Sequence, residues 1–90
     1  MKYRFRATRA FWNSFEKLPA QQQRRARKAF FIFKQNPFDP RLRSHKIHKL
    51  SARYARVIYA TKIEEDLRVV FYIEGDVVTT VDIGSHDLYR

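Results

Sequence analysis

Groups that can carry charge or a proton lie close together near the middle of the chain. An imidazole titrates near neutral pH and can act as a general acid or base, and lysine and arginine bind anions such as phosphate. In an extended chain alternate side chains share a side, which would place Lys46 with His48. We favour this pair as the reactive one, and the alternative is a solvated basic loop that only attracts a polyanion. The whole group comprises Arg43, His45, Lys46, His48 and Lys49.

A second set of such groups lies near the end of the sequence. His86 and Tyr89 follow Gly84, and Arg68 lies earlier, between apolar neighbours in a predicted strand. The histidine can transfer a proton, whereas a phenol is a poorer proton carrier at neutral pH unless its pKa is lowered. A metal site built from the three histidines of the chain is an alternative hypothesis. The histidines have no His-x-x-x-His spacing on a helix and no acidic cluster nearby, which disfavours it. We therefore predict no metal site and no cofactor.

The composition indicates a polyanionic partner. The 90 residues include 19 Lys or Arg and 9 Asp or Glu, for a formal net charge of +10. This balance favours RNA, DNA, acidic lipid or an acidic protein, although charge alone does not separate a binder from a nuclease. The absence of cysteine excludes disulfides, thiol catalysis and zinc sites built on cysteine. With no membrane-spanning run and no apolar leader at its start, the sequence predicts one cytoplasmic domain over residues 1–90.

The first half of the chain predicts one strand and two helices. Residues 3–7 alternate between arginine and aromatic or small residues, which is the period of a half-buried strand. Apolar residues then recur at helical spacing over residues 8–18, and Pro19 separates this helix from a second over residues 20–34. The second helix has one apolar stripe and is otherwise basic, so it either contacts phosphates or is simply solvated. The candidates for phosphate contacts on it are Arg24, Arg25 and Lys28.

The second half predicts three antiparallel strands, over residues 54–63, 67–73 and 77–83. The resulting order β-α-α-β-β-β is an α+β fold, with a helical hairpin packed against one face of a small, mostly antiparallel sheet. We expect the opposite face to be open, to form a shallow groove, and to expose Arg68 and Tyr72. The last strand is predicted to place four side chains on one side: Val77, Thr79, Val81 and Ile83.

The aromatic residues of the helices are predicted to form the core. Phe31 is the exception, because it falls off the apolar stripe of the second helix. It is either an exposed anchor for another protein or a filler of the seam between the helices. The residues with core-like helical spacing are Phe11, Trp12, Phe15, Phe30 and Phe33.

In this order, the segments resemble the RelE/ParE superfamily of bacterial and archaeal toxins over almost the whole chain. Each motif is loose by itself, but their order and spacing are far more specific than any one of them. The motifs are Phe11-x-x-x-Phe15-x-x-Leu18-Pro19, a basic helix ending at Asn36-Pro37, a segment centred on Leu50, Asp66-Leu67-Arg68-Val69-Val70-Phe71-Tyr72-Ile73, and Ile83-Gly84-Ser85-His86-Asp87-Leu88-Tyr89.

This resemblance implies two possible activities. RelE-like members are metal-independent endoribonucleases that cut mRNA, commonly in the ribosomal A site, whereas ParE-like members inhibit DNA gyrase. The closing segment looks like the tail of the ribonuclease branch, which favours RNA cleavage. The resemblance also implies an acidic antitoxin as partner. A non-catalytic basic nucleic-acid-binding module and a member that has lost toxicity remain alternatives.

For a ribonuclease of this kind, each candidate site residue can be given a role in the reaction. We expect Arg68 to bind the scissile phosphate, because its planar fork matches two oxygens and stays charged. His86 is the expected acid or base, with His48 and Lys46 as alternatives, so the identity of the general base stays open. Tyr89 is expected to stack on a base or to bind the phosphate. The expected RNA contacts outside these are Arg43, Lys49, Arg24, Arg25 and Lys28.

Overall fold

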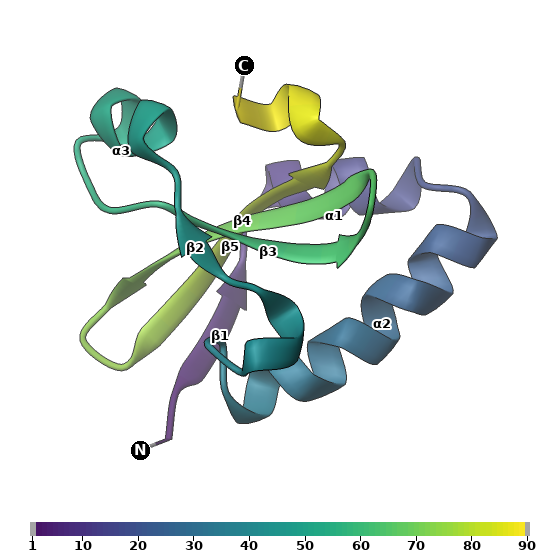
Figure 1. Ribbon diagram of the computed structural model, residues 1–90, viewed down its shortest axis with the longest axis horizontal. Coiled ribbons are helices and arrows are strands. Elements are labelled where there is room, and N and C mark those ends of the chain that lie inside the picture. The colour runs from purple at the N-terminus through teal and green to yellow at the C-terminus, as the bar shows by residue number, and fades with distance from the viewer. Residues whose placement is uncertain (1, 90) are drawn as a thin grey trace.

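A five-stranded sheet organises the molecule, with helices on both of its faces (Figure 1). The computed structural model describes residues 2–89, apart from the side chains of His86 and Tyr89. No helix in that span is long and apolar enough to cross a membrane. The elements are β1 (Arg4–Ala7), α1 (Arg9–Glu16), α2 (Ala20–Gln35), η1 (Pro40–Leu42), β2 (His45–Lys46), α3 (His48–Tyr54), β3 (Tyr59–Glu64), β4 (Leu67–Glu74), β5 (Val77–Gly84) and η2 (His86–Tyr89), where η marks a 3₁₀ turn.

The strands are ordered β1-β5-β4-β3-β2 across the sheet. Only β1 and β5 are parallel, and the other three neighbouring pairs are antiparallel. The predicted α+β class, the order of its six main elements and the mostly antiparallel sheet are therefore confirmed. The elements not predicted from the sequence are β2, α3 and the two 3₁₀ turns.

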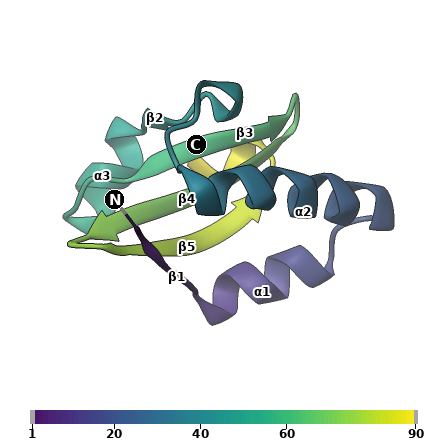
Figure 2. The same cartoon turned by 90° about the horizontal axis from the view of Figure 1, so that it is seen from below.

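The helices α1 and α2 cover one face of the sheet, as predicted (Figure 2). Phe11 and Phe15 of α1 pack on Val69 of β4, and Phe33 of α2 packs edge-on against Phe71, with ring centroids 4.9 Å apart. Alternate residues of β4 therefore face the helices, as its sequence pattern predicts. Trp12 departs from the prediction, because it is 51% exposed rather than part of the core.

A bulge in β5 changes which of its side chains face the helices. Val70 lies opposite Asp82, but the next residue of β4 lies opposite Thr80, so Val81 is one extra residue in β5. An extra residue reverses the alternation of side chains beyond it. Val78 and Ile83 consequently belong to the core beneath the helices, whereas Val81 packs on the other face. The predicted common side for all four alternate residues was wrong for this reason.

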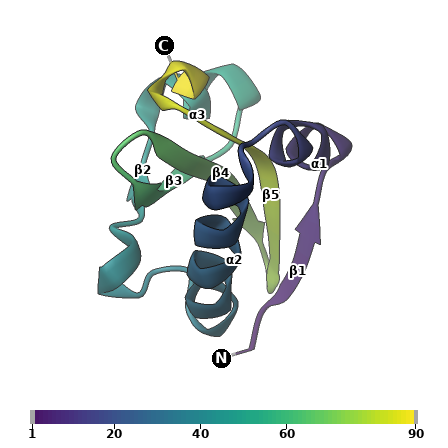
Figure 3. The ribbon, with the colours of Figure 1, turned by 90° about the vertical axis from the view of Figure 1, so that its right-hand side faces the viewer.

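The second face of the sheet is not open, because α3 packs on it. Leu50 of α3 lies in an apolar cluster with Ile58 and Val70, and the cluster also includes Leu88 of η2. Figure 3 shows α3 and the C-terminal turn beside each other at one end of the sheet. The predicted strand over residues 54–63 begins only at Tyr59, because the residues before it form α3 and a connecting loop.

Candidate active site

Arg68 lies in the middle of the sheet on the face that α3 covers. It alternates with Val69 along β4 and so shares its face with Val70 and Tyr72, which pack in the α3 cluster. Only 7% of Arg68 is exposed, so the expectation of an exposed arginine was wrong. Arg68 is buried because β4 is a central strand, with β3 on one side and β5 on the other. Burial makes this guanidinium a strong electrostatic feature of the face.

Lys62, which was not among the predicted site residues, is the cross-strand neighbour of Arg68. The two residues lie directly opposite each other in the β3–β4 ladder, so their side chains leave the same face of the sheet. Lys62 Nζ is 2.9 Å from Glu65 Oε2. Strand pairing across the hairpin would have placed Ile63 opposite Arg68, but an irregularity between Lys62 and Glu64 shifts the register by one residue.

The C-terminal tail begins beside Arg68. Gly84 lies opposite Arg68 in the β4–β5 ladder, and Leu88 of η2 folds back against it. A Cβ atom at Gly84 would lie 3.2 Å from Leu88 Cδ2, so the missing side chain makes room for the turn. The predicted site residues His86 and Tyr89 belong to this turn. Their side chains lie outside the described part of the chain, and their roles stay predictions.

The basic stretch before α3 divides between the two faces of the sheet. His45 lies opposite Ala60 and thus shares the face of Arg68, whereas Lys46 lies opposite Tyr59 and shares the face of α2. His48 is the first residue of α3 rather than part of an extended chain. The predicted pairing of Lys46 with His48 on one side was therefore wrong. Both histidines, both lysines and Arg43 are exposed.

His45 has a defined tautomer when its ring is neutral. Its Nδ1 atom is 2.9 Å from the carbonyl oxygen of Arg43. A carbonyl only accepts hydrogen bonds, so Nδ1 carries the proton and Nε2 keeps its lone pair. Arg43 itself has a left-handed backbone, with φ of 50°, which turns the chain into β2. His45 is thus a candidate base, although the sequence pattern favoured Lys46 and His48.

At the far end of the same face, a stacked pair fixes the loop after α3. Arg56 lies with its guanidinium carbon 4.3 Å from the centre of the Tyr72 ring, and its Nη1 atom is 3.2 Å from Glu74 Oε2. The contact combines a cation–π interaction with an ion pair. Arg56 therefore covers one side of the Tyr72 ring, and Tyr72 is half-buried. The open-face prediction had expected an exposed Tyr72. Arg56 was not predicted either, because its neighbours Tyr72 and Glu74 are distant in sequence.

The basic side chains of α2 lie on the other face of the sheet from Arg68. Arg24 and Lys28 are exposed on this helix. Arg25 forms an ion pair with Glu64, and the hydrogen bond from Gln22, followed by that from Arg25, lowers the pKa of the Glu64 carboxyl. These three predicted phosphate contacts thus belong to a surface separate from the Arg68 face.

Metal ligands do not gather in the part of the chain whose side chains are described. No group of three His, Asp or Glu side chains there is arranged to hold a metal ion.

Comparisons with known proteins find matches among solved structures. No family model matches the sequence, and no curated protein matches it. RelE in the RelE–RelB complex from Pyrococcus horikoshii OT3 aligns with a TM-score of 0.72 at 16% identity, over 94% of this chain and 96% of that chain. A copper-bound mutant toxin from Helicobacter pylori has a TM-score of 0.72 at 18% identity, over 98% and 99%. A YoeB/ParE toxin from Agrobacterium tumefaciens has a TM-score of 0.72 at 13% identity, over 92% and 98%. The chain therefore has the fold of the RelE/ParE toxins.

Proposed function

We propose that this protein is the toxin of a type II toxin–antitoxin pair. In this proposal it is a cytoplasmic endoribonuclease that cleaves mRNA, on the ribosome, without a metal ion. The observation that carries the proposal is the buried guanidinium of Arg68, which has Lys62 opposite it and the C-terminal tail beside it. The similarity to a RelE from a RelE–RelB complex supports the toxin role and an antitoxin partner.

The electrostatics of the Arg68 face support an anionic substrate. Like charges directly opposite each other in a ladder are destabilising, and a partly buried position strengthens the effect. Glu65 already pairs with Lys62, and a phosphate placed over Arg68 and Lys62 would reduce that repulsion further. Arginine binds phosphate in a bidentate manner and keeps its charge, so it suits the developing charge on the phosphoryl oxygens.

RNA supplies its own nucleophile, the 2′-hydroxyl next to each phosphodiester. The protein needs a base to deprotonate this hydroxyl, a cation on the phosphate and an acid for the departing 5′ oxygen. In our proposal Arg68 is the cation, assisted by Lys62, and His86 transfers a proton. His45 and His48 are the other candidates for proton transfer, with Lys46 as a further one. Tyr89 stacks on a base, and Arg43 and Lys49 contact the flanking backbone.

The products follow from this chemistry. Attack of the 2′-oxygen on phosphorus breaks the bond to the 5′ oxygen. One fragment therefore ends in a 2′,3′-cyclic phosphate and the other begins with a 5′-hydroxyl. Hydrolysis through an activated water would leave different ends, so the chemistry of the ends distinguishes the two routes.

Induced expression is the direct test of this function. Primer extension on cellular transcripts should reveal new 5′ ends within coding regions soon after induction. The Arg68→Ala variant should give none, whereas Arg9→Ala removes an exposed arginine of α1 and should behave as the wild type. Intact transcripts together with accumulated DNA breaks would instead identify a gyrase inhibitor. If both the transcripts and the DNA stay intact, the remaining hypothesis is a non-catalytic nucleic-acid-binding module.

A further inference from the structure

Two consecutive residues of β3 face the side of the sheet that α1 and α2 cover. Ile63 packs against the apolar cluster that contains Leu67, and the next residue, Glu64, is bonded to side chains of α2. Successive residues of a strand normally face opposite sides, so the alternation is interrupted between these two. The irregularity in the β3–β4 ladder between Lys62 and Glu64 is the backbone counterpart of this interruption.

The carboxylate of Glu64 is held by two side chains of α2. Gln22 Nε2 donates a hydrogen bond to Glu64 Oε1 at 2.9 Å, and the Arg25 guanidinium pairs with Oε2. The Glu64 side chain is only 22% exposed, whereas that of its neighbour Glu65 is 88% exposed. The hydrogen bonds from Gln22 and then Arg25 lower the pKa of Glu64, because both favour its charged form. Helix α2 therefore fixes the position of a carboxylate that belongs to β3.

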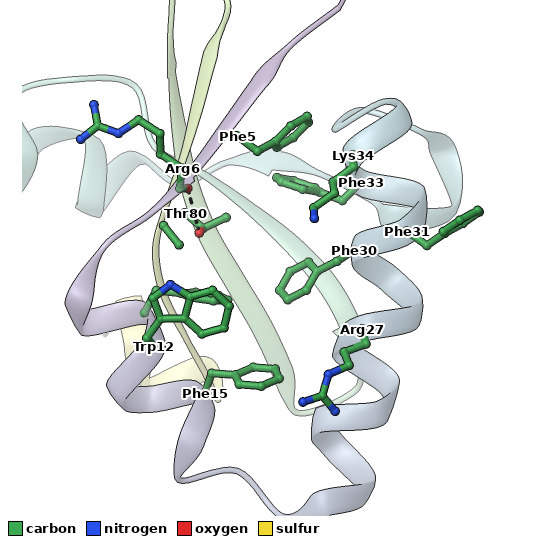
Figure 4. A pocket seen from close by; sticks show the side chains of 12 residues that line it. Phe5, Arg6, Trp12, Phe15, Arg27, Phe30, Phe31, Phe33, Lys34 and Thr80 are labelled. Carbon is green, nitrogen blue, oxygen red and sulfur yellow. Dashed lines mark hydrogen bonds between the residues drawn. The ribbon is translucent and has the colours of Figure 1, made fainter.

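The side chains of α2 do not all point the same way. Figure 4 shows Arg27 extending toward Phe15 across the groove between α1 and α2, with its guanidinium carbon 5.3 Å from the ring centre. Phe31 points away from this groove and is 71% exposed, so it does not fill the seam between the helices. Arg25 is instead directed at Glu64 of the β3–β4 hairpin. Arg27 is thus an arginine of the same helix that has a different partner.

A regular ladder would place Glu64 on the other side of the sheet. Lys62 lies opposite Arg68, so the next regular pair toward the turn would be Ile63 with residue 67. Ile63 and Leu67 already pack on one side, and this pair would keep them there. Glu64 would then leave the chain on the side of Lys62 and Arg68, as alternation requires. A carboxylate on that side would accept the same bidentate hydrogen bonds from arginine as a phosphate does.

We propose that Gln22 and Arg25 are positioning residues, which hold the Glu64 carboxylate against α2 and so keep it from competing with phosphate at Arg68. The proposal rests on the proposed function where it names phosphate, but the position of Glu64 does not. Arg25 was predicted to contact phosphate, and here it binds a carboxylate of its own chain. The positive charge of the Arg68 face is therefore maintained from the opposite side of the sheet.

Release of Glu64 should weaken RNA binding rather than slow the chemical step. The releasing variant combines Gln22→Ala with Arg25→Ala. If Glu64 then occupies the phosphate position in about nine molecules of ten, KM should rise on the order of tenfold, with a smaller change in kcat. Gln22→Ala alone should raise KM by less. Alanine favours a helix, so thermal melting should find both variants folded.

A third substitution separates this effect from the loss of a direct contact between Arg25 and RNA. Glu64→Gln, added to the releasing variant, removes the competing charge and should return KM close to the wild-type value. A lost RNA contact would not be restored in this way. An unchanged KM in the releasing variant, or an unrestored KM in the triple variant, would overturn the proposal.

The matched control is Gln21→Ala combined with Arg27→Ala. It removes the same two types of side chain and the same charge from α2, and both residues are exposed and are not bonded to Glu64. Its KM should stay close to that of the wild type. An equal rise in KM in the control and in the releasing variant would show that only the net charge matters, which would also overturn the proposal.

Nuclear Overhauser contacts across the β3–β4 hairpin test the position of Glu64 without any substrate. The wild type should show Glu64 opposite Leu67, and the releasing variant should show Ile63 opposite Leu67. A wild-type register in the releasing variant would overturn the proposal even if KM rises. If the wild type cleaves no RNA, the proposed function fails, and inorganic phosphate becomes the probe, followed by the Arg68 amide resonance. Equal binding of phosphate to the wild type and the releasing variant would then overturn the proposal.

Discussion

Arg68 and Gly84 face each other across the β4–β5 ladder, and the space left by the glycine is occupied by Leu88. The arginine thereby has a neighbour without a side chain, and the turn that carries His86 and Tyr89 starts at this point. Gly84, at the end of β5, thus allows the C-terminal turn to pack close to the buried Arg68.

This relationship predicts that Gly84→Ala impairs cleavage more than stability. The new Cβ would lie 3.2 Å from Leu88 Cδ2, at the end of a side chain that can move, so the fold survives while the tail shifts. We expect kcat/KM to fall about tenfold or more, because misplaced catalytic groups lose rate steeply. Gly75→Ala is the matched control. Its Cβ meets nothing within 4 Å but its φ is +60°, so stability should fall by about 1 kcal/mol with cleavage per folded molecule unchanged. The reverse pattern in the two variants would contradict the role of Gly84.

The two cations on the α3-covered face should differ in their contribution to cleavage. Arg68→Ala removes a donor to the phosphoryl oxygens and should lower kcat on the order of 100-fold or more. Lys62→Ala removes a charge that is also paired with Glu65, so we expect a smaller loss, about tenfold. Single-turnover cleavage of a defined RNA gives both values, and thermal melting shows whether each variant is folded. A folded Arg68→Ala protein with full activity would assign the phosphate to another residue.

Replacing each histidine by glutamine should identify the proton carrier. Glutamine keeps some hydrogen bonding but does not titrate, so the variant of the true carrier should lose about 100- to 10,000-fold in kcat and one limb of the pH–rate profile. We expect His86→Gln to show both changes. If it does not, His45→Gln and His48→Gln test the other two imidazoles, and an unchanged profile in all three leaves Lys46 or Tyr89.

Cleavage should continue in EDTA, because the proposed steps use only side chains and the RNA 2′-hydroxyl. The rate of cleavage is measured with and without the chelator on the same RNA, and the ends of the products are analysed in both. Loss of activity in EDTA that a divalent ion restores would support the histidine metal site instead. In that case the histidine variants should also lose metal affinity.

Thr8 should be important for stability because it joins α1 to the bulge in β5. Its Oγ1 atom accepts a hydrogen bond from the Phe11 N–H at 3.1 Å and donates one to the Val81 carbonyl at 2.7 Å. Thr8→Val keeps the shape and loses both bonds, which should cost about 2 kcal/mol in the free energy of unfolding. Urea denaturation measures this loss, and Thr8→Ser, which keeps the hydroxyl, should recover most of it.

Ala55→Gly should stabilise the protein. Ala55 ends α3 in a left-handed conformation, with φ of 56°, where a Cβ atom is unfavourable and glycine is not. The gain should be about 0.5 to 1 kcal/mol after the greater entropy of glycine in the unfolded chain is subtracted. A decrease in the free energy of unfolding would show that the alanine methyl group makes contacts that exceed the strain.

The elements that could be predicted from the sequence are those with a regular apolar repeat within their own residues. Helix α2 and strand β4 are correct almost to the residue, because each has a clear apolar pattern. The helix α3 was missed because its inward side rests on few apolar residues, such as Leu50, whose partners Ile58 and Val70 lie later in the chain. Long-range packing also explains the error at the site. Arg68 was predicted as a site residue, but its burial was not, because the elements that cover it lie elsewhere in the chain.

Registers across the sheet were the other source of error. A single extra residue, Val81 in β5, moved half of a predicted strand to the opposite face. Another irregularity, beside Ile63, brought Lys62 rather than Ile63 opposite Arg68. Neither irregularity has a sequence marker such as a glycine at the bulge, so only the packed sheet reveals which side chains are neighbours.

The parallel pairing of β1 with β5 determines when the sheet can be completed. Arg4 lies opposite Val77, so the first strand to be synthesised can pair only after the last strand has been made. Strand β5 must also insert between β1 and β4. Pairings so distant in sequence are slow, because a long loop must close before any contact compensates for the lost entropy. Gly84 lies at the end of that same strand. A ribosome that is translating this chain therefore carries no assembled Arg68 face until residues 77–84 have emerged, so the proposed cleavage can begin only after the last strand is in place.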